Sequence, residues 1–510
     1  MKTSSSPNRP VVLCMSLLLA VFLAACGRGS DDRDSALPTA TPVQEPTPSE
    51  QPAPEQPEPV EQADQPTPTP VPFSVLTTTR FAVQAVEGPD YLYHLVHRLP
   101  GQAQVRVTAQ NSSGNWLRVD LDGTAAWIAR WALEPQAGFR ELPQASADIP
   151  QPSTLERGSM PDAPPPIEFG YGTQAHMIGV DVDHIMWATR DLGFNWLKQQ
   201  IRWNITEPEQ GSYNWRDLDL IVSRATYSDV DLLFSVVTTP GWAREANYDA
   251  TVDGPPVDPQ DLASFMSAIA TRYCGTAVKA IEVWNEQNLH YEWGNLPLSG
   301  ADYVNLLIPS SQTIRAACPS MYVISGALTP AGSVPNLAVD DFTYLEQMLA
   351  NGLARHVDAI GAHPSGYNVP ANVRWQDGCA AIVQSGNTFN GACDNPHHSW
   401  SFRSTMEGYR DIALQYGVGL PIWPTEFGWA AGGAYHEAYG YANDNDFDEQ
   451  ARWTVEAFQM MKAWGWSGPA ILWNMNFRVI ADKTERAQWG IVNNDWTPLP
   501  VYNALKAMEK

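Results

Sequence analysis

Segments with the pattern of β-strands alternate with segments of helical pattern throughout residues 167–510. Strands separated by helices predict βαβ units and therefore a parallel sheet. Eight such units are what a (β/α)8 barrel requires, so we expect this α/β fold, with enlarged loops. The eight expected strands are Phe169–His176, Trp196–Trp203, Asp231–Thr238, Ala280–Asn285, Met321–Gly326, Ala359–His363, Pro421–Thr425 and Ala470–Met475.

Two of these strands end in a glutamate. Glu286 follows Ile281 and Val283, whose alternation is typical of a strand, and Glu426 ends the strand that begins at Pro421. The carboxyl ends of barrel strands form the face that carries catalysis in this architecture. Two carboxylates on one such face are the minimal equipment for hydrolysing a glycosidic bond.

Polar and aromatic residues follow the ends of several other strands: Arg202, Trp242, Asn285, His363, Tyr367, Trp473 and Asn474. With Trp-Asn-Glu-Gln-Asn at 284–288 and Thr-Glu-Phe-Gly-Trp at 425–429, this pattern resembles the clan of retaining glycoside hydrolases that carry Asn-Glu on strand four and Glu on strand seven. Within the clan it is most similar to glycoside hydrolase family 39, with family 5 next. The resemblance covers the whole of residues 167–510.

The resemblance implies a retaining hydrolase that cleaves a β-linked poly- or oligosaccharide by double displacement. Glu286 would be the general acid/base and Glu426 the nucleophile, with carboxyl groups about 5–5.5 Å apart. Glu426 must stay ionised, and a cation such as Arg202 beside it would serve that need. We expect Glu282, one strand repeat deeper than Glu286, to be a structural carboxylate paired inside the barrel.

The same resemblance assigns the substrate-binding residues. Asn285 would hydrogen-bond the 2-hydroxyl of the sugar, and Tyr367 or His363 would orient Glu426. Trp473 would form the floor of the sugar site, and Trp242 is a further candidate. Clan members carry a Tyr two residues after the His, whereas Tyr367 lies four residues after His363. Aromatic residues of the long loops are candidate walls for further sugar units: Trp375, Trp400, Tyr435, Tyr439 and Tyr441.

Two other functions stay open at this stage. The chain could be a lipoprotein that binds glycan or cell wall without cleaving it, or a transglycosylase with the same residues and another acceptor. No cofactor and no metal are expected, because neither His397-His398 nor the acidic run at 444–448 has a recognised ligand spacing, and both are interpreted as solvated loops. A net charge of -25 argues against nucleic acid as a partner.

The first 26 residues have the pattern of a bacterial export signal. Lys2 and Arg9 precede an apolar stretch that ends in Leu-Ala-Ala-Cys at 23–26. This ending resembles the lipobox of bacterial lipoproteins, in which Cys26 would become the lipidated N-terminus. We therefore expect a protein held by acyl chains at the outside of a bacterial membrane.

Two low-complexity segments flank a short region of β-type pattern. Residues 27–72 and 136–166 are rich in Pro, and we interpret both as linkers, the first of them disordered. Residues 73–135 contain short β-type runs separated by turn signals, which predicts a small all-β barrel. Gly101, Gly-Asn-Trp-Leu-Arg-Val at 114–119 and Trp-Ile at 127–128 resemble bacterial SH3 domains, which often bind cell-wall glycans. A packing or spacer module without a ligand is the alternative.

Four cysteines lie beyond the signal segment: Cys274, Cys318, Cys379 and Cys393. An even number in an exported protein suggests two disulfides. We favour Cys379–Cys393, which would close one loop rich in Gly and Asn, and Cys274–Cys318, which would join the ends of two consecutive helices. Four free buried thiols are the alternative.

Overall fold

The computed structural model describes residues 73–80, 83–89, 93, 95–145, 155, 157–158, 160–436 and 439–510. The expected signal segment, the lipobox cysteine Cys26 and the linker at 27–72 lie outside the described residues. Within the described part of the chain, no helix combines the length and apolar character needed to cross a membrane.

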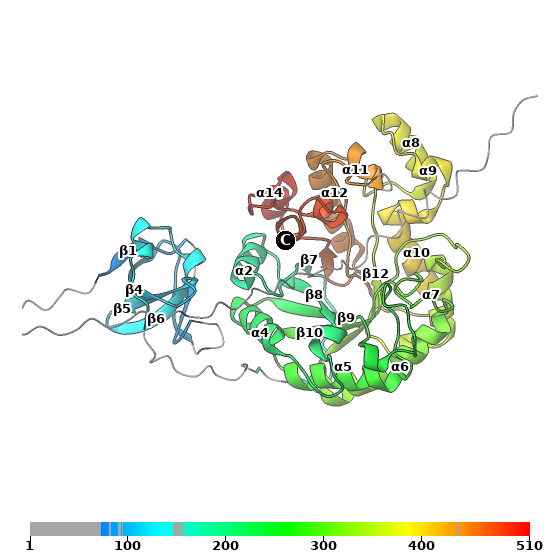
Figure 1. Cartoon of the computed structure of the whole chain (residues 1–510). Coiled ribbons are helices and arrows are strands. Elements are labelled where there is room, and N and C mark those ends of the chain that lie inside the picture. The colour runs from blue at the N-terminus through cyan, green and yellow to red at the C-terminus, as the bar shows by residue number, and fades with distance from the viewer. Residues whose placement is uncertain are drawn as a thin grey trace, which may run out of the picture.

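Eight parallel strands form a closed barrel in the C-terminal part (Figure 1). One run of neighbouring strands has the order β11-β10-β9-β8-β7-β14, and β12 pairs with β13. Parallel bridges between Ile324 and Ala359, and between Phe427 and Leu472, join these two groups into a ring. The strands are β7 (Tyr171–Gln174), β8 (Trp196–Arg202), β9 (Asp231–Val237), β10 (Val278–Val283), β11 (Tyr322–Ser325), β12 (Ile360–Ala362), β13 (Ile422–Pro424) and β14 (Ala470–Leu472). Each falls within a predicted strand or overlaps it, so the predicted (β/α)8 fold is confirmed.

Helices surround this ring, as Figure 1 shows. The longer ones are α2 (Val182–Asp191), α4 (Arg216–Ser228), α5 (Pro259–Tyr273), α6 (Gly300–Ala317), α7 (Asp341–Ala350), α10 (Phe402–Gln415), α12 (Phe447–Trp464) and α14 (Pro500–Ala507). Many begin at a side-chain cap. Asp446 and Glu449 form a capping box at the start of α12, and Asp258 caps α5 just before Pro259.

Alternation along the strands divides the core into two parts. Ile281 of β10 and Phe234 of β9 face the helices in the main apolar cluster. The residues that alternate with these along each strand point into the barrel. There a second apolar cluster includes Trp196 and Trp423, whose ring centroids lie 5.2 Å apart in an edge-to-face arrangement. This apolar plug fills one end of the barrel interior, so polar side chains gather nearer the carboxyl ends of the strands.

Both predicted disulfides are present. Cys274–Cys318 links the ends of α5 and α6. Cys379–Cys393 links α8 (Trp375–Ser385) to α9 (Gly391–Asp394), two short helices in the long loop after β12. The alternative of four free thiols is therefore excluded.

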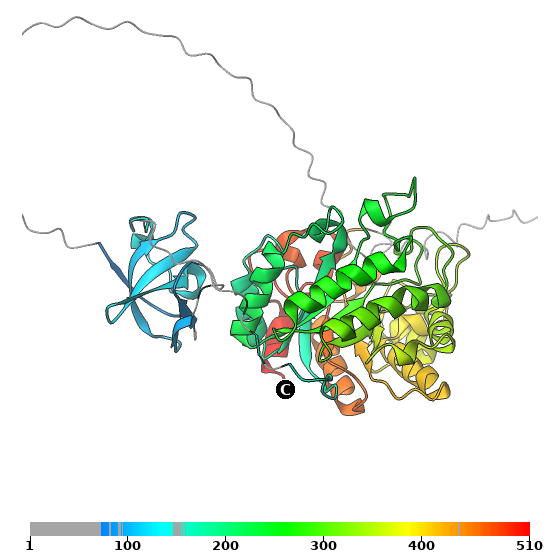
Figure 2. The same cartoon turned by 90° about the horizontal axis from the view of Figure 1, so that it is seen from below.

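Six strands between Val75 and Ala129 form an antiparallel sheet of order β1-β4-β5-β6-β2-β3, drawn in blue and cyan in Figure 2. Its strands are β1 (Val75–Thr78), β2 (Val83–Val86), β3 (Leu95–Leu99), β4 (Gln104–Gln110), β5 (Trp116–Leu121) and β6 (Thr124–Ala129). Phe139 and Leu142 pack into the core of this sheet. Residues 136–145, which the sequence assigned to the second linker, thus belong structurally with the sheet.

Candidate active site

A charged layer lies directly above the apolar plug in the barrel. Lys198 of β8 is fully buried, and its Nζ lies 3.0 Å from Oε2 of Glu282 and 3.0 Å from Oε1 of Glu426. Thr425 donates a hydrogen bond to Oε1 of Glu282 at 2.6 Å. The expectation that Glu282 is a paired structural carboxylate is confirmed, and one lysine serves both acids because a buried carboxylate needs a cation or hydrogen bonds.

Glu286 sits at the end of β10 in an unusual backbone conformation. Its φ is 44° and that of Trp284 is 78°, both in the left-handed region that side chains other than glycine rarely adopt. Neighbouring polar residues hold the segment in place. The Gln287 side chain donates to Gly326 O at 2.7 Å, and the Asn288 side chain donates to Thr329 O and accepts from Thr329 N. The polar run after Trp284 therefore fixes the position of Glu286.

His363, at the end of β12, bridges the two glutamates. Its Nδ1 lies 2.9 Å from Oε1 of Glu286, and its Nε2 lies 3.9 Å from Oε1 of Glu426. Burial lowers the pKa of His363, but the charge of Glu426 and the hydrogen bond to Glu286 outweigh burial and raise it overall. The sequence assigned His363 to orient Glu426, whereas the structure places it in hydrogen-bond contact with Glu286.

The two glutamates approach each other closely. Oxygen atoms of Glu286 and Glu426 and a ring nitrogen of His363 all lie within 4.8 Å of one another. Such a trio could also hold a metal ion. The ammonium group of Lys198, 3.0 Å from Glu426, disfavours a second cation at that carboxylate. The arrangement is better suited to proton transfer and nucleophilic attack than to metal binding.

A pocket opens over these groups. It is lined by Glu286, Thr329, Pro330, His363, Ser365, Tyr367, Glu426, Tyr441, Trp473 and Trp489. Tyr367 packs edge to face against Trp400 at 4.9 Å and against Tyr441 at 5.2 Å. An acidic pair beneath aromatic walls is typical of a site that binds a sugar ring, because aromatic faces stack on its apolar face.

A third acid lies next to the pair. Glu292 is fully buried, and burial followed by the charges of Asp253, Glu286 and Glu426 raises its pKa well above the usual value for a carboxyl. A hydrogen bond with the Asn285 side chain acts in the opposite direction. Asn285 is thus held by Glu292, and its own Oδ1 is buried with no partner among the described residues.

Three of the predicted binding residues do not line the pocket: Arg202, Asn285 and Trp242. Arg202 was expected beside Glu426, but the cation there is Lys198, and the buried Nε of Arg202 has no hydrogen-bond partner within the described residues. Trp242 donates through Nε1 to Glu207 O and packs against Trp203, so it serves loop packing. Glu286, Glu426, His363, Tyr367 and Trp473 do line the pocket.

Sequence analysis also missed Lys198 and several residues that line the pocket. Lys198 could have been found, since strand alternation places it on the same face as Arg202 and four residues deeper in the barrel. Thr329, Pro330 and Trp489 carry no motif, and loop geometry alone brings them to the pocket. Of the loop aromatics, Tyr441 lines the pocket and Trp400 supports Tyr367, whereas Tyr435 is half exposed.

No protein-family model matches the sequence, and the search of curated proteins found no match. Solved structures of similar fold do exist. One is a family 39 glycoside hydrolase from the gut symbiont Bacteroides cellulosilyticus WH2, with 16% identity over 86% of this chain and 78% of that chain and a TM-score of 0.49. A second is a family 39 β-xylosidase from Caulobacter crescentus, with 16% identity over 69% and 73% and a TM-score of 0.45. A third is xylanase 10B from Thermotoga maritima, with 15% identity over 67% and 94% and a TM-score of 0.43.

Proposed function

We propose that this chain is a retaining O-glycoside hydrolase that cleaves a β-linked poly- or oligosaccharide. One observation carries the proposal: oxygens of Glu286 and Glu426 lie within 4.8 Å of each other in a single aromatic pocket. Inverting enzymes separate their carboxyl groups by about 6.5–9.5 Å to admit a water, whereas retaining enzymes hold them about 5–5.5 Å apart. The spacing supports direct attack by one carboxylate.

Glu426 is assigned as the nucleophile because of its cationic neighbour. Lys198 lies 3.0 Å from Oε1 of Glu426 and favours the ionised form that attack requires. In the first step a Glu426 oxygen bonds to the anomeric carbon while the glycosidic oxygen leaves with its electron pair. In the second step water displaces Glu426 from that carbon, so two inversions retain the configuration.

Glu286 is assigned as the general acid and base because no lysine or arginine of the described residues forms an ion pair with it. Of these residues His363 alone hydrogen-bonds its carboxyl group, through Oε1, and Oε2 is buried without a partner among them. Oε2 can therefore carry the proton that passes to the leaving oxygen. After that transfer the ionised Glu286 removes a proton from the attacking water, which restores the acid for the next cycle.

The two roles are tested by single substitutions assayed on aryl β-glycosides of several sugars. Glu286→Gln and Glu426→Gln should each lower kcat by at least about 10²–10⁴-fold. Glu209→Gln, a change at an exposed carboxylate outside the pocket, is the matched control and should leave kcat unchanged. Full activity of either pocket variant would contradict the assignment.

Azide distinguishes the nucleophile from the acid and base. With Glu286→Ala and a good leaving group, azide attacks the glycosyl-enzyme and gives a β-glycosyl azide. With Glu426→Gly, azide occupies the place of the carboxylate and gives an α-glycosyl azide. The reverse pattern of products would exchange the two roles, and a protein that binds glycans without cleaving them would yield neither product.

The location and the second module belong to the same proposal. Lipidation at Cys26 would hold the enzyme outside a bacterial membrane, and the sheet at 75–129 would be an SH3-like module that binds cell-wall glycan. Metabolic labelling with a fatty-acid analogue should tag the wild-type chain and not Cys26→Ala. Equal labelling of both would refute the anchor, and a lack of binding to purified peptidoglycan would refute the glycan role of the module.

A further inference from the structure

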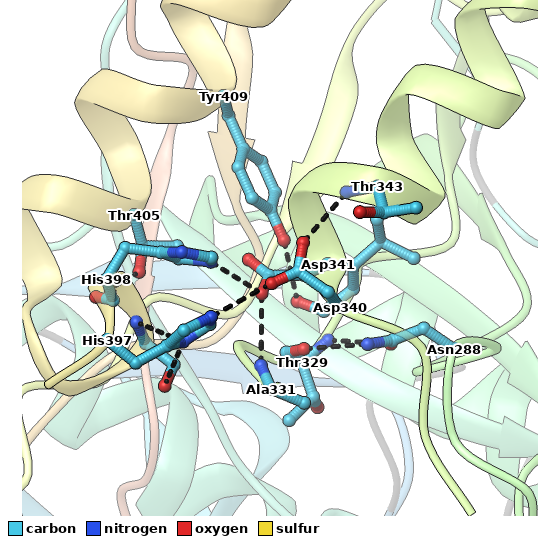
Figure 3. A network of polar contacts seen from close by, with 12 residues as sticks. Asn288, Thr329, Ala331, Asp340, Asp341, Thr343, His397, His398, Thr405 and Tyr409 are labelled. Atoms are coloured by element: carbon cyan, nitrogen blue, oxygen red, sulfur yellow. Dashed lines mark hydrogen bonds and ion pairs between the residues drawn. The ribbon is translucent and has the colours of Figure 1, made fainter. Parts of the chain in front are cut away.

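Two aspartates and two histidines form a cluster (Figure 3). Asp340 and Asp341 begin α7, and His397 and His398 belong to the short turn before α10. Nε2 of His397 lies 3.0 Å from Oδ2 of Asp340, and Nε2 of His398 lies 2.8 Å from Oδ1 of Asp341. Sequence analysis interpreted His397-His398 as a solvated loop. This interpretation is wrong for His398, because its side chain is buried and the residue is only 8% exposed.

Capping of α7 does not use all the carboxylate oxygens of this cluster. Oδ1 of Asp340 accepts the Thr343 amide at 2.9 Å and thereby caps α7, which leaves Oδ2 facing His397. Asp341 is fully buried, and its Oδ1 accepts the Ala331 amide at 3.0 Å. Oδ2 of Asp341 is buried and makes no hydrogen bond of ordinary geometry within the described part of the chain, although the Tyr409 hydroxyl faces this carboxylate. Each of the two carboxylates thus keeps one oxygen that no backbone amide satisfies.

We propose that Asp340, His397 and His398 bind one divalent transition-metal ion, with Asp341 as the adjacent fourth oxygen donor. One donor atom from each of the first three residues lies within 4.8 Å of the other two. Zn–N and Zn–O bonds of about 2.0–2.1 Å in a tetrahedron place the donors about 3.3 Å apart. The distances of 3.0 and 2.8 Å need only a small expansion to admit such an ion.

The donor types select the class of metal. Imidazole nitrogen with carboxylate oxygen suits Zn²⁺ and its transition-metal neighbours, whereas Ca²⁺ and Mg²⁺ prefer oxygen alone. Two carboxylates with two neutral imidazoles carry a charge of about -2, which one divalent ion neutralises. This neutralisation also offsets the cost of burying the Asp341 carboxylate.

Surrounding groups can orient the two imidazoles. Nδ1 of His397 accepts the Ser399 amide at 3.3 Å and lies 2.9 Å from Ser399 Oγ, so Ser399 fixes the ring with its Nε2 toward Asp340. The His398 ring stacks on Phe342 with 3.5 Å between ring centroids. The side chains of His397 and Asp340 are 25% and 17% exposed, so an ion can reach the cluster from solvent.

A bound ion would join two segments of the pocket wall. Asp341 holds Ala331, which follows the pocket residues Thr329 and Pro330. On the other side, Trp400 lies two residues after His398 and packs against Tyr367 of the pocket. The metal would thus be a structural clamp, and its binding does not depend on the reaction proposed for the pocket.

Metal binding is tested on the purified protein after treatment with EDTA and dialysis. Titration with ZnCl2 against a chromophoric chelator, with metal content measured by mass spectrometry, should give about one tight ion per chain and a raised Tm. Asp340→Asn and His397→Gln should each weaken Zn²⁺ binding more than about 100-fold, because even loss of an outer partner costs 10–100-fold. Asn still caps a helix, so Asp340→Asn should keep the Tm of the metal-free protein.

Two further variants separate this site from other histidines and acids. His356→Gln changes a histidine outside the cluster, and Glu286→Gln changes the trio in the pocket. Both should bind Zn²⁺ as the wild type does. The proposal is overturned if no stoichiometric Zn²⁺ binds, if Asp340→Asn and His397→Gln bind it normally, or if Glu286→Gln abolishes binding.

Discussion

Nζ of Lys198 lies 3.0 Å from Oε1 of Glu426, in the interior of the barrel and at full burial of the lysine side chain. The same ammonium group contacts Glu282 at 3.0 Å. Two carboxylates therefore depend on one cation. Because burial alone would lower the pKa of Lys198, and the charges of Glu282 and Glu426 reverse this and raise it, the lysine is charged throughout the neutral range.

Lys198→Met should therefore impair both folding and reaction. The substitution leaves two buried carboxylates without their cation, and breaking a buried ion pair in this way costs about 3–5 kcal/mol. Urea denaturation should show the loss of stability, and kcat on an aryl β-glycoside should fall. Lys279→Met is the control: Lys279 is exposed on β10, and its removal should change neither quantity appreciably. Equal effects of the two substitutions would contradict the central position given to Lys198.

Much of the fold followed from alternation in the sequence. All eight barrel strands were predicted, because buried parallel strands bounded by helices carry a strong local signal. The strand pairing that closes the ring around β12 and β13 could not be derived from the sequence, since these strands have only three residues each. Phe139 and Leu142 were assigned to a linker because a Pro-rich neighbourhood masks two single apolar residues.

The site was predicted less completely than the fold. Glu286, Glu426, His363 and Trp473 end strands, and a strand end has a defined place on the barrel face. Arg202 was chosen in place of Lys198 because Arg202 ends its strand, although alternation places both side chains on the same face. The partners of His397 and His398 come from a distant helix, so only tertiary structure could reveal them.

Glu485 should make stability depend on pH. Its Oε2 is fully buried, and burial, with the charges of Glu286 and Glu426, raises its pKa to about 7 despite a hydrogen bond from Trp489. The folded state therefore binds the carboxyl proton of Glu485 more tightly than the unfolded state does. The resulting contribution to the free energy of unfolding is complete below the unfolded pKa and is lost as pH rises through 7. Glu485→Gln should thus gain about 3 kcal/mol over wild type near pH 8 and roughly nothing near pH 4.

Chemical denaturation of both proteins across this pH range checks the expectation. Glu509→Gln, at an exposed position near the C-terminus, should show no such dependence. If the free energy of unfolding of Glu485→Gln differs from that of wild type by the same amount at every pH, the Glu485 carboxyl titrates normally.

Glu292→Gln should leave Tm and KM nearly unchanged. The pKa of Glu292 is raised well above the ordinary value, first by burial, so the folded protein holds a neutral carboxyl that an amide can replace. Glu292→Ala, in contrast, removes the partner of Asn285 and leaves a cavity, which costs about 2–5 kcal/mol. Tm and KM of the two variants give the comparison. Severe loss of stability in Glu292→Gln would show that Glu292 is ionised in the folded protein.

The two disulfides should contribute unequally to stability. Cys274–Cys318 spans 44 residues and Cys379–Cys393 spans 14. From the entropy of loop closure in the unfolded chain, their loss should cost about 4 and about 3 kcal/mol, respectively. Denaturation midpoints of the Cys274→Ser/Cys318→Ser and Cys379→Ser/Cys393→Ser proteins test this order. A larger loss from the shorter loop would indicate that native packing and not chain entropy sets the difference.

The stereochemistry of the first product tests the central claim most directly. Proton NMR during cleavage of an aryl β-glycoside records the anomer released before mutarotation. With Glu286 and Glu426 within 4.8 Å of each other, direct attack by Glu426 predicts that the β anomer appears first. Initial release of the α anomer would contradict the double displacement and the roles given to both glutamates.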